Sequence, residues 1–232
     1  NKPLADLLAY AAQFASTVKR KAVLELAEEV GRVADFEVEH PFEDYAFFPM
    51  GIPGYPGTDT GLLERKRDLF VASPFLSDDI VARLTDFRGR KTLITRKASV
   101  TPRVFEAFDH VYITKDVLSD NEFGAKQDIH AKLYFAAMED GNYLYIGSAN
   151  ASHNGFYRNG ECLLRLKYKP YQMGFHLFCE EFLPKDGCPF QELTGIPEQP
   201  EEDSERKQAA QVLQEAVYAR ERGGSTAQRG EL

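Results

Sequence analysis

Between residues 68 and 114, short apolar runs with the spacing of strands alternate with segments that have the spacing of helices. Each helical segment opens with residues that favour a helix start: Ser77-Asp78-Asp79 in the first, and Thr101-Pro102 in the second. The order strand, helix, strand, helix, strand predicts βαβ units, which form a largely parallel sheet covered by helices. The strands are expected at 69–72, 91–95 and 110–114.

The pattern changes after Asp116, where strands follow one another without a helix between them. A turn rich in Asp, Gly and Asn separates two apolar runs, which predicts a hairpin. The chain is therefore expected to be α/β, with a central mixed β-sheet flanked by helices on both faces. The elements expected in this part are a polar loop at 117–127, strands at 129–136, 143–146 and 161–166, the hairpin turn at 139–142, and a closing helix at 173–183.

The first part of the chain has a different composition. Residues 4–33 have helical spacing, with a break expected at Ser16 or Thr17 and an end at Gly31. A short strand is expected at 36–38, and the Gly- and Pro-rich stretch 51–57 can be neither helix nor regular strand. The expected domains are an N-terminal helical segment with its loop at 1–57, a catalytic domain at 58–195, and a charged C-terminal tail at 196–232 with one helix at 209–219.

Composition excludes several classes of protein. An apolar content of 43% and an aromatic content of 12% are typical of a globular chain, and no apolar run is long enough for membrane insertion. Three widely spaced cysteines without a Cys-x-x-Cys pair argue against a zinc site and favour a cytoplasmic location. The net charge of −8 argues against a general basic coat, although basic residues cluster at 88–103 and 158–169.

The strongest candidate for a site is the hairpin. In a strand over 129–136, His130 and Lys132 share the polar face with Asp128 and Tyr134, because strand side chains alternate between faces. A neutral imidazole can act as nucleophile or base, and an ammonium beside it can hold an anion, so the pair suits attack on a phosphate.

Further polar residues follow the returning strand. Ser148 and Asn150 offer a hydroxyl and an amide for phosphate oxygens, and Gly147 allows the backbone to come close to a ligand. At the start of the next strand lie Asn159, expected to bind substrate, and Glu161, a carboxylate suited to orienting a catalytic histidine.

These residues together resemble the motif set of the phospholipase D superfamily. The matching pieces are His130-x-Lys132, Gly147-Ser148-x-Asn150 and Asn159-x-Glu161; Ser73-Pro74-Phe75 resembles the nuclease-like branch. The resemblance covers roughly residues 68–183. It implies a metal-independent phosphodiesterase in which one histidine forms a phosphohistidine and a second protonates the leaving group, with no cofactor.

Two departures from the family pattern have consequences. Ala137 stands where the fuller motif has an aspartate, which favours the nuclease-like branch over the lipases. The chain has one His-x-Lys where the family uses two. The second half-site is therefore expected from another copy, in a homodimer, or from a part of a longer protein, since the sequence begins at Asn1 and not at a methionine.

Three functions stay open. The preferred one is a nuclease, with DNA favoured over RNA and with Arg158 and the basic stretch 88–97 as candidate nucleic-acid contacts. The alternatives are a phospholipid hydrolase or transphosphatidylase with the same chemistry, and a catalytically inactive nucleic-acid-binding domain of the same fold. For Arg158, surface solubility is an equally good explanation.

Overall fold

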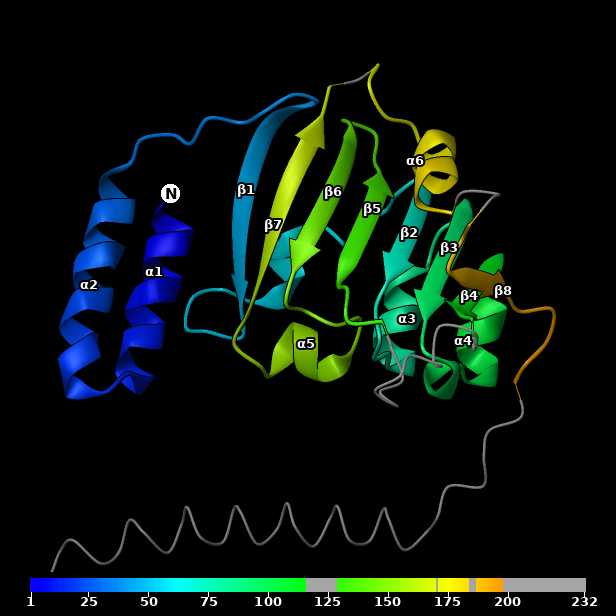
Figure 1. Ribbon diagram of the computed structural model, residues 1–232, viewed down its shortest axis with the longest axis horizontal. Coiled ribbons are helices and arrows are strands. Elements are labelled where there is room, and N and C mark those ends of the chain that lie inside the picture. The colour runs from blue at the N-terminus through cyan, green and yellow to red at the C-terminus, as the bar shows by residue number, and fades with distance from the viewer. Residues whose placement is uncertain (116–128, 170, 184–186, 198–232) are drawn as a thin grey trace, which may run out of the picture. The chain divides into compact units, whose positions relative to one another are not determined.

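One mixed sheet of eight strands organises the computed structural model, in the order β1-β7-β6-β5-β2-β3-β4-β8 (Figure 1). The three strands of the βαβ units are parallel to one another, and all other neighbours are antiparallel. This confirms the α/β class with a central mixed sheet. The strands are β1 Phe42–Met50, β2 Asp68–Ala72, β3 Arg90–Thr95, β4 His110–Thr114, β5 Leu133–Ala137, β6 Asn142–Gly147, β7 Glu161–Tyr168 and β8 Phe190–Glu192.

Helices cover both faces of the sheet, as predicted. Helices α3 (Asp78–Leu84), α4 (Pro102–Ala107) and α5 (His153–Tyr157) contribute buried side chains to one core cluster, together with Val71 and Tyr134 of the strands. Helix α6 (Phe175–Phe182) packs against Phe70 and Phe135 on the other face. The central strands are therefore buried on both sides, as is typical of βαβ units.

The N-terminal part begins with two helices, α1 (Lys2–Ala11) and α2 (Thr17–Arg32), separated by a 3-10 turn at Ala12–Phe14. The break at Ser16 is confirmed, because Ser16 is the N-cap of α2, whereas Gly31 lies inside that helix. The strand expected at 36–38 is wrong. The strand in this part is β1, which pairs along its length with β7.

Phe36, the first residue of the expected strand, contacts β1 instead: its ring packs against the rings of Tyr45 and Phe47. The backbone N–H of Phe36 donates to the hydroxyl of Tyr45 on β1 (2.8 Å), and that hydroxyl donates to the side chain of Asn1 (2.7 Å). Residues before β1 thus tie the first helix to the edge of the sheet. Segment 1–57 therefore supplies an edge strand of the same sheet as the residues that follow it.

The structure describes residues 1–115, 129–169, 171–183 and 187–197. Residues Asn1–Pro197 form one compact unit. The loop expected at 117–127, Asp128 and the helix expected at 209–219 lie outside the described residues. None of the described helices has the length and apolar character that crossing a membrane requires.

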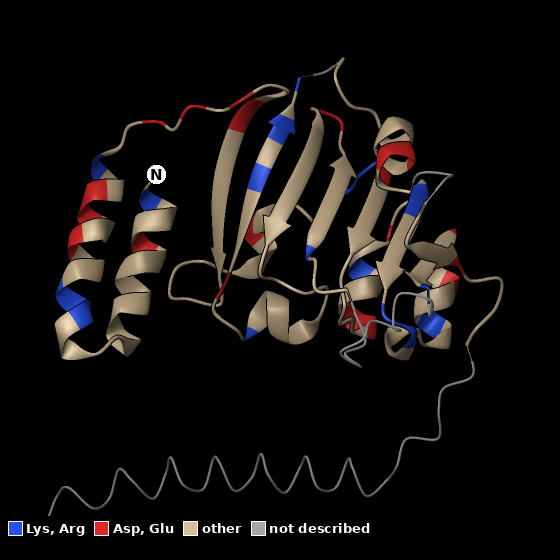
Figure 2. Cartoon of the chain, in the orientation of Figure 1, with Lys and Arg blue, Asp and Glu red and all other residues tan. Residues whose placement is uncertain are grey.

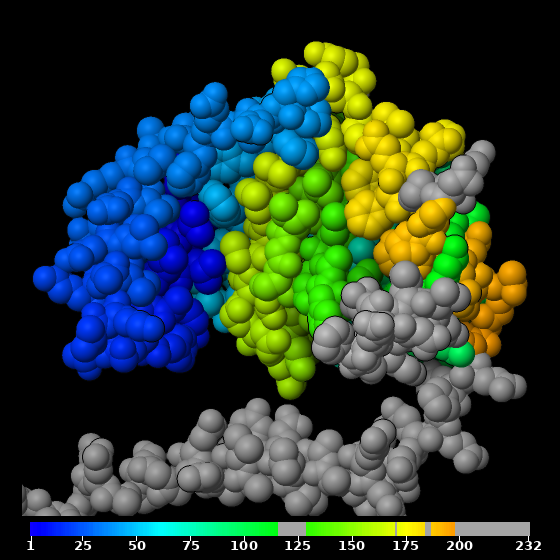
Figure 3. Space-filling view, viewed as in Figure 1, coloured from blue at the N-terminus to red at the C-terminus, as the bar shows by residue number. Residues whose placement is uncertain are grey.

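On the α6 side, the sheet is only partly covered. Atoms of the central strands are visible between the N-terminal helices and α6 (Figure 3). Ile146 of β6 is 36% exposed there, whereas its neighbour Tyr145, pointing to the other face, is fully buried. The two faces of the hairpin thus differ in burial.

Candidate active site

The motif residues gather where several strands of the sheet begin or end, at the bottom of the sheet in Figure 1. We call this boundary the site edge, as distinct from the outermost strands β1 and β8. Strands β2 and β6 end at this edge, and β5 and β7 begin there. The pairing fixes this arrangement: Ala72 at the end of β2 lies opposite Leu133, the first residue of β5, and Gly147 at the end of β6 lies opposite Leu163. The loops that follow β2 and β6 and those that precede β5 and β7 therefore lie side by side.

His130 and Lys132 lie immediately before β5 and not within it. This corrects the expectation of a strand beginning at Ile129 with a polar face. Strand β5 begins at Leu133, and Tyr134 and Phe135, on opposite faces, are both fully buried. A strand in the middle of a sheet covered on both sides has no polar face, so the two motif residues are placed outside it, where His130 is exposed.

Two hydrogen bonds hold the segment that carries this pair. The carbonyl oxygen of Lys132 accepts from the backbone N–H of Gly147 (3.2 Å), which continues the β5–β6 ladder one step. The ammonium of Lys132 donates to the carbonyl oxygen of His130 (2.8 Å). The ladder brings Lys132 beside the end of β6. The His130-x-Lys132 motif therefore lies next to the Gly147-Ser148-x-Asn150 motif.

Ser148 is hydrogen-bonded to β7 through both its backbone and its side chain. Its N–H donates to the carbonyl oxygen of Cys162 (3.0 Å), and its hydroxyl oxygen accepts from the N–H of Cys162 (3.1 Å). The hydroxyl proton remains to be donated, because a serine hydroxyl has one donor and two acceptor positions. The preceding Gly147 is required for close approach, since a Cβ there would lie 2.0 Å from the Cys162 carbonyl oxygen.

The side chain of Asn150 has a buried oxygen, Oδ1, without a hydrogen-bond partner among the described residues. Folding normally pairs such an atom, because a buried unpaired acceptor costs free energy. Helix α5 packs directly behind Asn150: a Cβ on Gly155 would lie 2.4 Å from the Asn150 carbonyl oxygen. Asn150 thus has a rigid backbone and a side-chain amide with unused hydrogen-bonding capacity.

Glu161 is the first residue of β7, and its carboxylate accepts a hydrogen bond from Asn159 (3.2 Å). It also acts on Tyr134: burial, and then the Glu161 charge, raise the pKa of that phenol. The Tyr134 hydroxyl donates to the carbonyl oxygen of Ala149 (2.9 Å). Glu161 therefore lies at the same edge, although no bond to His130 is present among the described residues.

The Gly- and Pro-rich loop after β1 also reaches this edge. A Cβ on Gly51, whose φ is +67°, would lie 2.0 Å from the carbonyl oxygen of Asn159. Arg158, the second residue expected to contact substrate, follows α5 and is exposed. This loop packs against the backbone of the Asn159-x-Glu161 motif, whose polar side chains lie at the surface.

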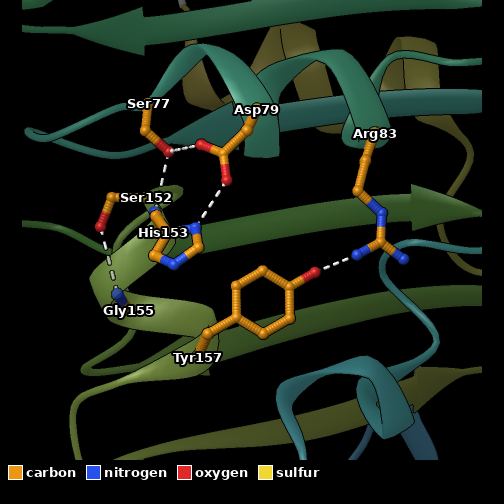
Figure 4. A network of polar contacts seen from close by, with 7 residues as sticks. All are labelled: Ser77, Asp79, Arg83, Ser152, His153, Gly155 and Tyr157. Atoms are coloured by element: carbon orange, nitrogen blue, oxygen red, sulfur yellow. Dashed lines mark hydrogen bonds and ion pairs between the residues drawn. The ribbon is translucent and has the colours of Figure 1, made fainter.

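Sequence reasoning missed a network that joins α3 to α5 (Figure 4). The hydroxyl of Ser77 accepts from the N–H of His153 (2.8 Å) and donates to Asp79 (2.6 Å), and the Asp79 carboxylate binds the His153 ring at Nδ1 (2.7 Å). These hydrogen bonds, the one from Ser77 first, hold the pKa of Asp79 below its usual range. The available signals were the helix start at Ser77 and the histidine after Asn150, but neither indicates a pairing.

Basic and acidic residues are interspersed over the helices and strands (Figure 2). Several members of the stretch 88–103 are engaged within the fold. Arg90 forms an ion pair with Asp68 (2.8 Å) and lies over the ring of Phe175, while the ammonium of Lys91 lies over the ring of Phe87. These contacts lie at the opposite edge of the sheet, where β2 and β3 begin, so this part of the basic stretch is structural.

Among the residues that the structure describes, no group of three or more His, Cys, Asp or Glu side chains is arranged to hold a metal ion. The catalytic candidates are of another kind: the imidazole of His130, the ammonium of Lys132, the hydroxyl of Ser148, the amide of Asn150 and the carboxylate of Glu161. The ammonium, the hydroxyl and the amide are groups that can donate hydrogen bonds to an anion.

No protein-family model and no curated protein matches this sequence. Solved structures share part of its fold. NucT from Helicobacter pylori is 19% identical over 53% of this chain and 84% of its own, with a TM-score of 0.38. Nuc from Salmonella typhimurium, a phospholipase D family member, is 11% identical over 55% of this chain and 86% of its own, with a TM-score of 0.40.

A phosphatidylserine synthase from Haemophilus influenzae is also similar, at 11% identity over 87% of this chain and 52% of its own, with a TM-score of 0.46. Identities this low show a likeness of fold alone, so the function has to be inferred from this chain's own residues.

Proposed function

We propose that this protein is a metal-independent phosphodiesterase, with a nucleic acid as its substrate and His130 as its nucleophile. The observation that supports this is the meeting of three motifs at one edge: the Lys132 carbonyl beside Gly147, Ser148 bonded to Cys162, and Glu161 at the start of the next strand. The motifs lie next to the ends of three consecutive strands, β5, β6 and β7, and the pairing of these strands supports their closeness.

The proposed reaction has two steps. The ring nitrogen of His130 attacks phosphorus, a P–N bond forms, and the P–O bond to the leaving group breaks as that oxygen takes a proton from a second imidazole. Water then cleaves the P–N bond, and the second imidazole accepts its proton. Lys132, Ser148 and Asn150 hold the phosphate oxygens, where the fixed positive charge of Lys132 stabilises the charge of the transition state.

A nucleic acid, and DNA before RNA, is the preferred substrate class. The reason is Ala137, which stands where the fuller family motif has an aspartate; the absence of that aspartate favours the nuclease-like branch. Ala137 is buried in β5 on the α6 side, so this motif position faces the core. A phospholipid substrate with the same chemistry is the runner-up, and a binding domain without turnover is the third alternative.

Cleavage of a radiolabelled single-stranded DNA and of a duplex, in excess EDTA, tests the proposal. We expect turnover to persist in EDTA, to be abolished in His130→Ala, and to fall nearly as far in Lys132→Ala. His176→Ala is the matched control, because His176 lies on α6 with a side chain that is 78% exposed. Substantial activity in His130→Ala, or loss in EDTA that magnesium restores, would show that the assignment is wrong.

The second imidazole is the open requirement of this mechanism. Of the other four histidines, His153 lies near the site, on α5, whereas His40, His110 and His176 lie away from it. His110 begins β4 at the opposite edge and binds Glu192 (2.7 Å), and His40 precedes β1 at that same opposite edge. The ring of His153 is held by Asp79. These positions favour a homodimer, in which twofold symmetry brings His130 of each copy to a shared cleft; a second half-site within a longer chain is the alternative.

Subunit mixing tests the shared cleft. Wild-type and His130→Ala subunits exchanged in equal amounts give heterodimers with one imidazole at the cleft, and total activity should fall well below half. Wild-type protein mixed with the His176→Ala control should keep full activity. A loss strictly proportional to the fraction of variant, with an isolated monomer that still cleaves, contradicts the dimer.

A further inference from the structure

The hydroxyl of Ser77 is turned away from the task that its position predicts. Ser77 is the N-cap residue of α3, where a serine side chain usually accepts from an N–H of its own helix. Here it makes no such bond. It accepts from the N–H of His153 on α5 and donates to Asp79, so a capping residue of one helix serves the start of another (Figure 4).

The segment between β2 and α3 holds the loop after β6 at several points. The Ser73 hydroxyl accepts from the N–H of Ala151 (3.0 Å), and the N–H of Ser77 donates to the carbonyl oxygen of Ala151 (3.1 Å). The bond from the His153 N–H to the Ser77 hydroxyl satisfies one of the free N–H groups at the start of α5. The residues that follow Asn150 are therefore held by the segment between β2 and α3, which is not part of the β5–β6 hairpin.

Helix α5 connects these contacts to Asn150. His153 and Gly155 are two residues apart, which places them about 200° apart around the helix. His153 faces Asp79 on α3, and Gly155 is buried against the backbone of Asn150, where even a Cβ would not fit. A movement of α5 away from α3 therefore shifts the support behind Asn150.

The contacts of this network are partly open to solvent. The side chains of His153 and Asp79 are 47% and 50% exposed, and ion pairs with such exposure contribute little to stability. The geometry of the contacts, and not their energy, is what distinguishes them.

We propose that Ser77, Asp79 and His153 form a clamp of positioning residues that fixes Asn150 for contact with the substrate phosphate. This inference rests on the proposed phosphodiesterase function and names residues for it beyond the motifs. The clamp residues act through α5 and Asn150, and they do not take part in the chemical step.

The test compares Ser77→Ala with Ser77→Thr in the cleavage assay. Ser77→Ala removes both bonds of the hydroxyl, including the one to the first N–H of α5, but no cap bond within α3. We expect kcat/KM to fall about tenfold, mostly through kcat, as for other residues that orient a site group. Ser77→Thr retains the hydroxyl and should restore most of the activity. Asp79→Ala should behave like Ser77→Ala.

The matched control is Tyr157→Phe, which removes the contact of the Tyr157 hydroxyl with Arg83, between the same two helices but beyond the clamp. It should keep wild-type kcat. Hydrogen exchange gives a second readout, since the N–H groups of Ala151 and His153 should exchange faster in Ser77→Ala and at the wild-type rate in Tyr157→Phe.

The outcomes separate the two proposals. If wild-type protein cleaves, and His130→Ala does not, but Ser77→Ala matches the Tyr157→Phe control in kcat/KM, the clamp is overturned and the phosphodiesterase stands. Equal loss in Ser77→Ala and Ser77→Thr also overturns it, because the hydroxyl would then not matter. If wild-type protein does not cleave, the proposed function fails and the positioning role fails with it.

Discussion

Lys66 is a buried cation whose environment predicts a measurable dependence of stability on pH. It is 4% exposed, and its ammonium donates to the carbonyl oxygens of Glu64 (2.8 Å) and Leu84 (3.2 Å) and lies 5.2 Å from the centre of the Phe87 ring. Burial lowers the pKa of Lys66 from 10.5 to about 8, against the smaller opposing effect of Glu64 and Asp86. The fold therefore tolerates the charged form at a cost.

The size of this cost follows from the pKa. A difference between 10.5 and about 8 corresponds to ~3 kcal/mol, at 1.36 kcal/mol for each pKa unit. The folded state releases the proton first, so between pH 8 and 10.5 the unfolded state binds more protons and the free energy of unfolding rises with pH. Below pH 8 both states are protonated and the cost is present in full. Between pH 7 and 10 we expect roughly 2–3 kcal/mol to be recovered.

Urea unfolding of wild type and Lys66→Met at pH 7 and pH 10, with a reductant, measures the effect. Other groups that titrate in this range are common to both proteins, so their contributions cancel in the difference. The stability of the wild type relative to Lys66→Met should increase by roughly 2–3 kcal/mol from pH 7 to pH 10. A relative change below ~1 kcal/mol, which is close to the error of extrapolation, would refute the reasoning.

Two further predictions concern the backbone and the cysteines. Gly147→Ala places a Cβ 2.0 Å from the Cys162 carbonyl oxygen, so we expect a loss of ~3 kcal/mol and a melting temperature lower by roughly 10 °C, with calorimetry as the measurement; an unchanged melting temperature contradicts the close approach. Burial raises the pKa of the Cys179 thiol to about 11, so at pH 8 only about 0.1% is thiolate. Iodoacetamide should alkylate Cys179 much more slowly in the folded protein than in urea, and equal rates would show that the thiol is accessible.

The central βαβ units could be predicted from the sequence because their signals are local. Thr101 shows this: it was expected as an N-cap from its place before Pro102, and its hydroxyl accepts from the N–H of Val104 (3.2 Å). The apolar runs of β2, β3 and β4 are short and bounded by turn residues, so their periodicity and length sufficed.

Elements defined by tertiary contacts escaped prediction. Strand β1 contains Pro49 and follows Pro41. Proline is unfavourable inside a sheet, but an edge strand tolerates it because one side of the strand needs no hydrogen bonds. Helix α5 has five residues, too few for a periodic pattern. The pairing of Ser77 with His153 joins residues 76 positions apart, and no local pattern encodes it.

The candidate site shows the same division. Its residue types and order were evident, whereas their support was not: Lys132 and Ser148 owe their positions to ladder bonds with Gly147 and Cys162, which depend on the sheet register. The expectation of a polar strand face around His130 was wrong because α helices cover both faces of β5. The residue pattern is local, whereas the geometry that supports it depends on the pairing of distant strands.

The exposure of His130 gives the proposed dimer a second purpose. Electrostatic stabilisation of a phosphoryl transition state is weak in bulk water and becomes strong when water is excluded. In one copy His130 is at the surface, so the ammonium of Lys132 acts there through a high dielectric. A second copy placed over this edge supplies the missing imidazole and excludes water from the phosphate in the same event.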